Sequence, residues 1–246
     1  MSVNAYTTGA EPQIVSRRTF MVGTSAIAAS GLIAGCSSVD TQGLVVSQGV
    51  SSGLPDINYA SAYAPVVDSE VPLPAFDYSR MDPKYLRKWV RFNSRHKPGT
   101  VVVDGSGPHL YLVQANKTAI RYGTAVGKEG HAWYGDAVMK WKQKWPTWTP
   151  PREMIERTPR LAEFADGMPA GVDNPLGARA LYLFKDGKDT LFRIHGTNRP
   201  FSIGKAASSG CFRMINQDVI DLYTRVPPGS LVYVKSNLDD EIYRSR

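Results

Sequence analysis

The sequence predicts a mainly β fold, and three of its features support that prediction. Short runs rich in Val, Ile, Leu, Phe and Tyr follow one another from about residue 100 onward. Gly, Asn and Asp residues separate these runs and mark turns, and only two segments carry a helical pattern. With 246 residues, of which 42% are hydrophobic and 10% aromatic, the chain is long enough for one or at most two domains with a sizeable core.

Turn signals divide the expected strands. They fall at residues 105–107, 116–117 and 185–188, and each is short enough to join two antiparallel neighbours. We therefore expect a compact, mostly antiparallel domain over residues 99–235, followed by a C-terminal tail over 236–246. The expected strands are Thr100–Asp104, Leu110–Gln114, Ala119–Val126, Ala180–Phe184, Thr190–His195 and Leu231–Lys235.

Two helices are expected around these strands. A basic helix is expected over 76–98, because Asp82-Pro83 is suited to begin a helix and Pro98-Gly99 to end one. Its aromatic stripe would pack on the domain or, alternatively, face a membrane or the cell wall. The second helix is expected to begin at Asn216, which would act as its N-cap. The residues of the aromatic stripe are Tyr85, Trp89 and Phe92.

Residues 131–177 interrupt the β pattern with a long connection rich in proline and tryptophan. A connection of this length is usually functional, so we expect it to form a lid or a wall of a site. The alternative is that its tryptophans form a small core of their own. Trp148 is a candidate for contact with substrate. This connection holds four of the five tryptophans of the chain, Trp133, Trp141, Trp145 and Trp148.

The first 35 residues are typical of an export signal. Arg17-Arg18 precedes an apolar stretch, Met21–Ala34, which at about 14 residues is shorter than the roughly 20 that span a bilayer. Around Cys36 the chain resembles a bacterial lipoprotein precursor, which implies cleavage before Cys36 and a lipid anchor on it. Residues 36–75, rich in Ser, Gly and Pro, are expected to be a flexible tether. We therefore expect a location in the bacterial periplasm or cell envelope.

Export would change which partners the positive charge of the chain can meet. The net charge is +7, and removing Arg17, Arg18 and Glu11 with the signal leaves +7 minus 1, or +6. Outside the cytoplasm a basic surface would meet anionic lipid headgroups or the carboxylates of cell-wall peptides. Nucleic acid is therefore not expected as a partner.

Cys211 is the one thiol left once Cys36 is assigned to lipid. An unpaired thiol in an oxidising compartment is either buried and inert or used as a nucleophile. Its neighbours Ser208, Ser209 and Gly210 are small and polar, unlike the surroundings of a core cysteine. This context favours a nucleophile, whereas a structural role remains the alternative.

A nucleophilic thiol needs a base, because only a few per cent of a free thiol is ionised at neutral pH. Of the four histidines, His195 is the strongest candidate, since it ends an expected strand and so stands on a rigid element. The polar stretch 196–210 is long enough to fold back and bring Cys211 beside it. The other three are His96, His109 and His131.

At these residues the chain resembles the L,D-transpeptidase catalytic domain family, also called YkuD or ErfK/YbiS/YcfS/YnhG. The resemblance covers about residues 99–235. It rests on His195-Gly196, on Ser208-Ser209-Gly210-Cys211-Phe212-Arg213 and on Asn174-Pro175-Leu176-Gly177, with Asn216 and Asp218 following. Many members have histidine where this chain has Ser209, which argues against a base at that position. The resemblance implies a β-sandwich-like domain.

It also implies a cysteine enzyme that acts on peptidoglycan stem peptides without a cofactor. Cys211 would attack the stem carbonyl and release D-alanine, and His195 would be the base, oriented by the Gly196 carbonyl. Backbone N–H groups of Gly210 and Cys211 would hold the oxyanion. Arg213 would bind a substrate carboxylate or, alternatively, form a structural salt bridge. Ser208 and Ser209 are further candidate substrate contacts.

The acyl acceptor is left open by the residues. A second stem peptide would give a cross-link, water would make the protein an L,D-carboxypeptidase, and an amine of an envelope protein would give covalent anchoring. A lipid-tethered wall-binding module without activity is a further alternative. Carbapenem β-lactams are expected as inhibitors of the catalytic forms.

Other enzyme classes fit the sequence less well. A sortase-like enzyme would need a Thr-Leu-x-Thr-Cys context, and a papain-like protease would carry its cysteine before its histidine. No His, Asp and Glu cluster has the spacing of metal ligands, and the Gly-Lys within residues 123–130 lacks the Ser or Thr of a phosphate loop. We therefore expect neither a metal nor a nucleotide.

Overall fold

The computed structural model describes residues 53–67, 71–105, 107–126, 134–205 and 210–235. The expected signal over 1–35, the lipidation site Cys36 and the tail over 236–246 lie outside these residues, as do His131, Trp133, Ser208 and Ser209. Within the described part of the chain, no helix has the length and apolar character needed to cross a membrane. All described residues belong to one compact unit, residues 49–246.

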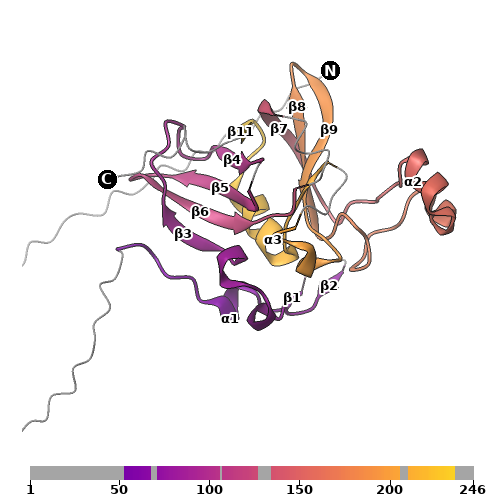
Figure 1. Cartoon of the computed structure of the whole chain (residues 1–246), viewed down its shortest axis with the longest axis horizontal. Coiled ribbons are helices and arrows are strands. Elements are labelled where there is room, and N and C mark those ends of the chain that lie inside the picture. The colour runs from indigo at the N-terminus through magenta and orange to yellow at the C-terminus, as the bar shows by residue number, and fades with distance from the viewer. Residues whose placement is uncertain (1–52, 68–70, 106, 127–133, 206–209, 236–246) are drawn as a thin grey trace, which may run out of the picture. The chain divides into compact units, whose positions relative to one another are not determined.

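Nine strands form one mixed sheet in the order β10-β9-β8-β7-β11-β4-β5-β6-β3 (Figure 1). Most neighbours are antiparallel, whereas β10 runs parallel to β9 and β11 runs parallel to β4. The expected mainly β fold with a few short helices is therefore confirmed. The strands are β3 Lys88–Arg91, β4 Val101–Asp104, β5 His109–Gln114, β6 Thr118–Gly123, β7 Gly135–Lys144, β8 Arg179–Lys185, β9 Lys188–His195, β10 Phe212–Arg213 and β11 Ser230–Lys235.

Two expected turns have the backbone geometry of tight hairpins. Asn116 and Lys117, between β5 and β6, have φ of 57° and 55°, and Asp186 and Gly187, between β8 and β9, have φ of 49° and 77°. Positive φ at both central residues matches the right-handed twist of the flanking strands. Local sequence therefore sets the register of these two hairpins.

The core lies between the two ends of the sheet and the helix α3, Asn216–Arg225 (Figure 1). Both ends contribute fully buried side chains to it, such as Val101 and Leu110 from one and Leu181 and Ile194 from the other. Tyr122 of β6 donates a hydrogen bond to Asp221 of α3 at 2.7 Å. Because both ends of the sheet share one core with α3, the domain has the sandwich-like character expected.

The expected basic helix over 76–98 is wrong. The segment holds two short 3-10 turns, η1 Tyr78–Arg80 and η2 Pro83–Tyr85, and then β3. Strand β3 pairs antiparallel with β6, so that Trp89 lies opposite Ile120. This pairing gives the backbone groups on the outer edge of β6 their hydrogen-bond partners. The gain outweighs the modest helical preference of a short basic segment.

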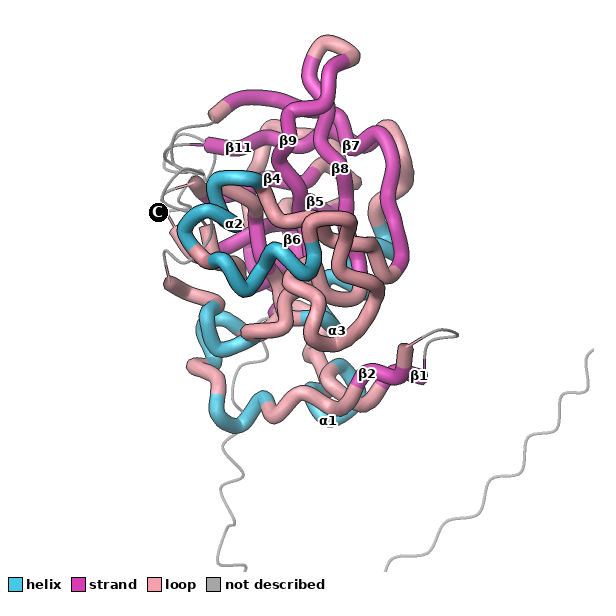
Figure 2. The backbone as a smooth tube through the Cα atoms, turned by 90° about the vertical axis from the view of Figure 1, so that its right-hand side faces the viewer, coloured by secondary structure: helices cyan, strands magenta, loops and turns pink. Residues whose placement is uncertain are grey.

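The expected flexible tether over 36–75 is also wrong for its described part. A short helix, α1 Tyr59–Ala62, is followed by the two-stranded pair β1 Val66–Val67 and β2 Pro72–Leu73 (Figure 2). Tyr63 is 1% exposed and packs with Phe76 and Ile215. Burial of these aromatic side chains compensates for the ordering of a segment rich in Ser and Pro.

The connection over 131–177 is only partly an insertion. Its residues from 135 to 144 form β7, a central strand between β8 and β11. The exposed Lys140 and Lys144 interrupt the apolar pattern of this strand, in which Ala137 and Met139 are buried in the core. The excursion proper starts at Trp145 and carries α2 Arg152–Arg157 and η4 Pro159–Phe164, with α2 standing away from the sheet (Figure 1).

The described tryptophans of this connection do not share a core. Trp145 is 4% exposed and packs with Leu73 and Ala178. Trp141 is 43% exposed and stacks on Tyr182 of β8, with ring centroids 3.8 Å apart. The alternative of a small tryptophan core is therefore not supported within the described residues.

Candidate functional site

The parallel pairing of β9 and β10 brings together the two segments that carry the expected catalytic residues. Phe212 lies opposite Ile194 and Arg213 lies opposite His195. Phe212 and Ile194 are fully buried in the core. Because side chains alternate along a strand, His195 and Arg213 lie on the other face of the pair, and Cys211 directly precedes β10.

His195 is buried, and its ring is fixed by the backbone that follows it. Its Nδ1 lies 2.6 Å from the carbonyl oxygen of Gly196, which only accepts, so Nδ1 carries the proton. Burial, together with the positive charge of Arg213, lowers the pKa of His195 to about 4. At neutral pH the ring is therefore uncharged, and its Nε2 is the nitrogen able to accept a proton.

Cys211 is half-buried and contacts β9. Its Sγ donates to the carbonyl oxygen of Leu191 at 3.8 Å. Burial raises the pKa of the Cys211 thiol, while the backbone N–H of Arg193 and the charges of Arg193 and Arg213 oppose this rise. The thiol is therefore protonated at neutral pH, and a base must take its proton during any attack.

Gly210 precedes the thiol in a conformation that favours glycine. Its φ is 128°, and the residue is buried against the ring of Phe192. A side chain at this position would be strained whatever space surrounds it. The oxyanion role of its N–H group stays a prediction.

Arg213 is held by its backbone rather than by its charge. Its N–H and carbonyl both pair with Ala125, at 3.0 Å each. Among the described residues no ion pair to its guanidinium is found, so the structural salt bridge has no support there. Burial, together with the charge of Arg199, lowers the pKa of Arg213. A half-buried cation of this kind is suited to bind an anion.

Asn216 connects α3 to the segment after His195, a role that sequence reasoning did not assign to it. Its Oδ1 accepts from the N–H groups of Ala178 at 3.0 Å and Thr197 at 3.2 Å, and its Nδ2 donates to the Thr197 carbonyl at 3.0 Å. A Cβ on Gly196 would collide with Oδ1, so glycine is required for this approach. The expected N-cap role is wrong, because Ile215 occupies that position.

Asn174 fixes the base of the excursion in the same way. It is fully buried, and its Nδ2 donates to the carbonyl groups of Pro146 at 3.0 Å, Met168 at 3.2 Å and Pro169 at 3.0 Å. Trp148 lies within this excursion and pairs with Met168 through the backbone. Its expected contact with substrate, and the role of the excursion as a lid or wall, stay predictions.

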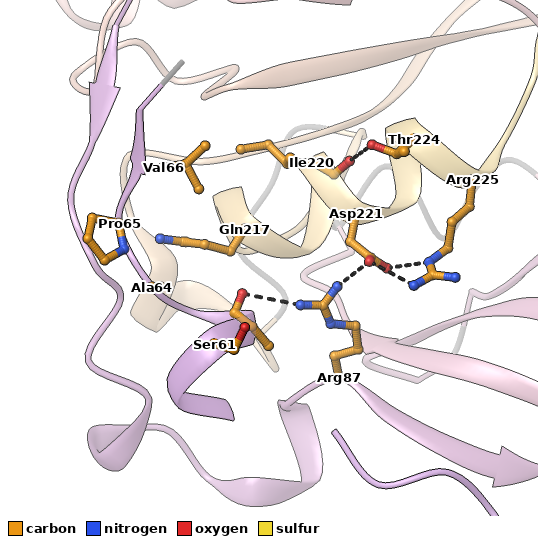
Figure 3. A pocket seen from close by; sticks show the side chains of 11 residues that line it. Ser61, Ala64, Pro65, Val66, Arg87, Gln217, Ile220, Asp221, Thr224 and Arg225 are labelled. Atoms are coloured by element: carbon orange, nitrogen blue, oxygen red, sulfur yellow. Dashed lines mark hydrogen bonds and ion pairs between the residues drawn. The ribbon is translucent and has the colours of Figure 1, made fainter. Parts of the chain in front are cut away.

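The pocket shown in Figure 3 is separate from these residues. It lies between α1 and α3 and contains neither Cys211 nor His195. Arg87 crosses it, pairing with Asp221 at 2.6 Å and donating to the Ala62 carbonyl at 3.2 Å. This pocket therefore marks how the N-terminal segment is attached to α3. Within the described residues no group of three His, Cys, Asp or Glu side chains could hold a metal ion.

Comparison with known proteins shows to which family the chain is similar. The model of the L,D-transpeptidase catalytic domain matches residues 98–234. A probable L,D-transpeptidase of Escherichia coli K12, ErfK/SrfK, is 42% identical over 97 residues, which are 38% of this chain and 29% of that protein. Another from the same strain, YbiS, is 34% identical over 140 residues, which are 54% of this chain and 43% of that protein.

This chain therefore spans less than half the length of these two relatives. A crystal structure from Brucella melitensis, described as a probable carnitine operon oxidoreductase, is 51% identical, and the match covers 63% of this chain and 96% of that one with a TM-score of 0.44. A TM-score of this size does not transfer a function. Since the family model covers more than half of the sequence, the chain belongs to the L,D-transpeptidase catalytic domain family.

Proposed function

We propose that the chain is an L,D-transpeptidase that acts on the tetrapeptide stems of peptidoglycan through a Cys211 acyl-enzyme. The observation that supports the proposal is the register of β9 and β10, which pairs Arg213 with His195 and leaves Cys211 directly before β10. A buried imidazole that is uncharged at neutral pH, with its tautomer set by the Gly196 carbonyl, is suited to act as a base. The half-buried guanidinium of Arg213 provides a counter-charge for a substrate carboxylate.

In the first half-reaction Sγ attacks the carbonyl of the diaminopimelate L-centre, and its proton passes to Nε2 of His195. The tetrahedral oxyanion is bound by the N–H groups of Gly210 and Cys211, a contribution of about 3–4 kcal/mol per donor in other acyl-transfer enzymes. His195 then gives the proton to the departing nitrogen, so that the C–N bond breaks and D-alanine leaves. The product is a thioester on Cys211 with His195 uncharged again.

In the second half-reaction an amine attacks the thioester while His195 accepts its proton. The proton returns to the departing sulfur, which restores the thiol. An amine of a second stem gives a 3-3 cross-link, an amine of an envelope protein gives anchoring, and water gives a carboxypeptidase product. Ser208, Ser209 and Trp148 are proposed to contact the substrate, and the protein is proposed to work in the periplasm on a lipid anchor at Cys36.

The test is mass spectrometry of the protein after incubation with a carbapenem. We expect one adduct on Cys211 in the parent protein and strongly slowed formation in His195→Ala. His109→Ala is the matched control, because His109 is a partly buried ring on β5 whose Nε2 contacts the Lys84 carbonyl at 2.9 Å. Absence of the adduct, or formation unaffected by His195→Ala, contradicts the assigned roles.

Incubation with tetrapeptide muropeptides then separates the acceptors. Cross-linked dimers indicate transpeptidation, and tripeptides alone indicate hydrolysis. If neither product forms although the carbapenem acylates Cys211, a protein amine is the remaining acceptor to be tried. If the carbapenem fails as well, the wall-binding module without activity is favoured.

A further inference from the structure

Strand β9 contains a local distortion directly beside Cys211. The register between β8 and β9 shifts between Tyr182 and Phe184, and Leu191 of β9 has a φ of 63°. A leucine in this left-handed region is uncommon, and its side chain is 76% exposed, so burial does not explain the conformation. Bulges of this kind often lie next to active sites, where they redirect a backbone group.

Side chains of β9 itself hold the distortion. Asp189 Oδ1 accepts from the N–H of Leu191 at 2.8 Å, and Thr190 Oγ1 accepts from the N–H of Phe192 at 3.2 Å. The Asp189 carboxylate also receives both ends of the Arg193 guanidinium, at 2.7 Å each. Burial would raise the pKa of Asp189, but the hydrogen bonds from Arg193 and Leu191 outweigh it and hold that pKa below its usual value.

The Arg193 guanidinium is fixed from a second side. It lies over the ring of Tyr182 at 4.3 Å, and that ring stacks in turn on Trp141 with an interplanar angle of 11°. Arg193 is thus locked between a carboxylate and an aromatic pair, an arrangement that restricts the rotamers of a long side chain.

The distortion presents two groups to the thiol. The Leu191 carbonyl accepts from Sγ, and the Arg193 N–H lies close enough to the sulfur to stabilise the thiolate. We propose that Asp189 and Arg193 are positioning residues for Cys211, which act through the Leu191 bulge and through their paired charges. The proposal rests on the proposed function in one respect, namely that Cys211 is the nucleophile.

The two charges act on the thiol in opposite directions. The charges of Arg193 and Arg213 favour the thiolate, whereas the charge of Asp189 opposes it. Asp189→Asn keeps an oxygen that accepts from Leu191 but loses the charge, so we expect the pKa of Cys211 to fall. Arg193→Gln should raise that pKa. We expect each shift to be about half a pH unit.

The experiment measures the rate at which iodoacetamide alkylates Cys211 in the full chain between about pH 6 and pH 11. Peptide mass spectrometry reads Cys211 separately from Cys36. Arg193→Lys retains the charge and should restore the midpoint of the pH profile toward that of the parent. Glu156→Gln is the control, because it removes one carboxylate from an exposed Arg152–Glu156 pair on α2. Opposite shifts in Asp189→Asn and Arg193→Gln support the proposal, since a purely structural role would not reverse sign.

A second pair of variants tests the backbone. Leu191→Gly tolerates the positive φ and Leu191→Val does not, while both replace an exposed side chain. We expect Leu191→Val to slow acylation of Cys211 by a carbapenem about tenfold and Leu191→Gly to change it little.

Equal behaviour of this pair, or midpoint shifts that are absent or of one sign, would overturn the proposal. These results differ from failure of the proposed function, because alkylation requires only a thiol. A parent protein that is alkylated but never acylated refutes the nucleophile role. In that case the shift of the alkylation midpoint still decides whether Asp189 and Arg193 tune the thiol.

Discussion

Replacing Asn216 with alanine is expected to loosen the connection between α3 and the segment that follows His195. The change removes the acceptor for the Ala178 and Thr197 N–H groups and the donor to the Thr197 carbonyl. A buried polar group left without a partner costs about 1–3 kcal/mol, and water entering the vacated space recovers part of this. For three such groups we expect the free energy of unfolding to fall by about 3 kcal/mol.

Urea denaturation of the full chain measures this loss. Gln217→Ala is the matched control, because Gln217 is the next residue of α3, is also buried, and donates one hydrogen bond to the Pro74 carbonyl at 2.9 Å. The free energy of unfolding of this control variant should fall by about 1 kcal/mol. Asn216→Asp keeps an acceptor for both N–H groups but sets an oxygen against the Thr197 carbonyl. Its loss in free energy of unfolding should therefore lie between those of Gln217→Ala and Asn216→Ala.

The rate of Cys211 acylation distinguishes a displaced His195 ring from a mere loss of protein stability. Thr197 follows Gly196, whose carbonyl orients the His195 ring, so Asn216→Ala should slow acylation of Cys211 more than Gln217→Ala does at a temperature where both are folded. The assigned role of Asn216 is wrong if Asn216→Ala destabilises the protein no more than Gln217→Ala and is acylated at the same rate.

Three further outcomes are expected. A pKa of about 4 keeps His195 uncharged well below the ordinary range of histidine, so the acid limb of the acylation rate should lie near pH 4 rather than 6.5, and a limb near 6.5 would contradict the burial argument. Burial, together with the nearby Asp221, raises the pKa of Asp218 to about 7 against the opposing effects of Arg87 and Tyr63. The unfolded carboxyl therefore loses its proton at lower pH than the folded one, and stability should decline from about pH 4 to pH 7. Asp218→Asn should remove that decline in urea denaturation, and an unchanged slope would exclude Asp218 as its source. Cys36→Ala should release the protein from the membrane fraction, whereas retention would exclude the lipid anchor.

The features that the sequence predicted well are those set by local residues. The hairpin turns at 116–117 and 186–187 need positive φ, and Asn, Asp and Gly at these turns signal it directly. The roles of Cys211 and His195 stay predictions, which rest on their immediate neighbours and on the family motif.

The features that were missed depend on partners far away in the chain. Strand β3 forms because β6 offers it an edge, and β7 is a central strand although three lysines interrupt its apolar pattern. Asn216 looked like a helix cap because its tertiary partners, Ala178 and Thr197, have no local signature. Leucine does not favour a positive φ, so the residue type at 191 could not predict the bulge beside the thiol.

The attachment of the N-terminal segment to α3 has a practical consequence for where this domain begins. A shortened protein that started at residue 98, where the family match begins, would lack Arg87, which pairs with Asp221 and lies 3.5 Å from the fully buried Asp218. It would also lack β3, which leaves the hydrophobic strand β6 with an open edge ready to pair with another chain. Fragments cut at the family boundary are therefore expected to aggregate, whereas those that begin before α1 should remain monodisperse.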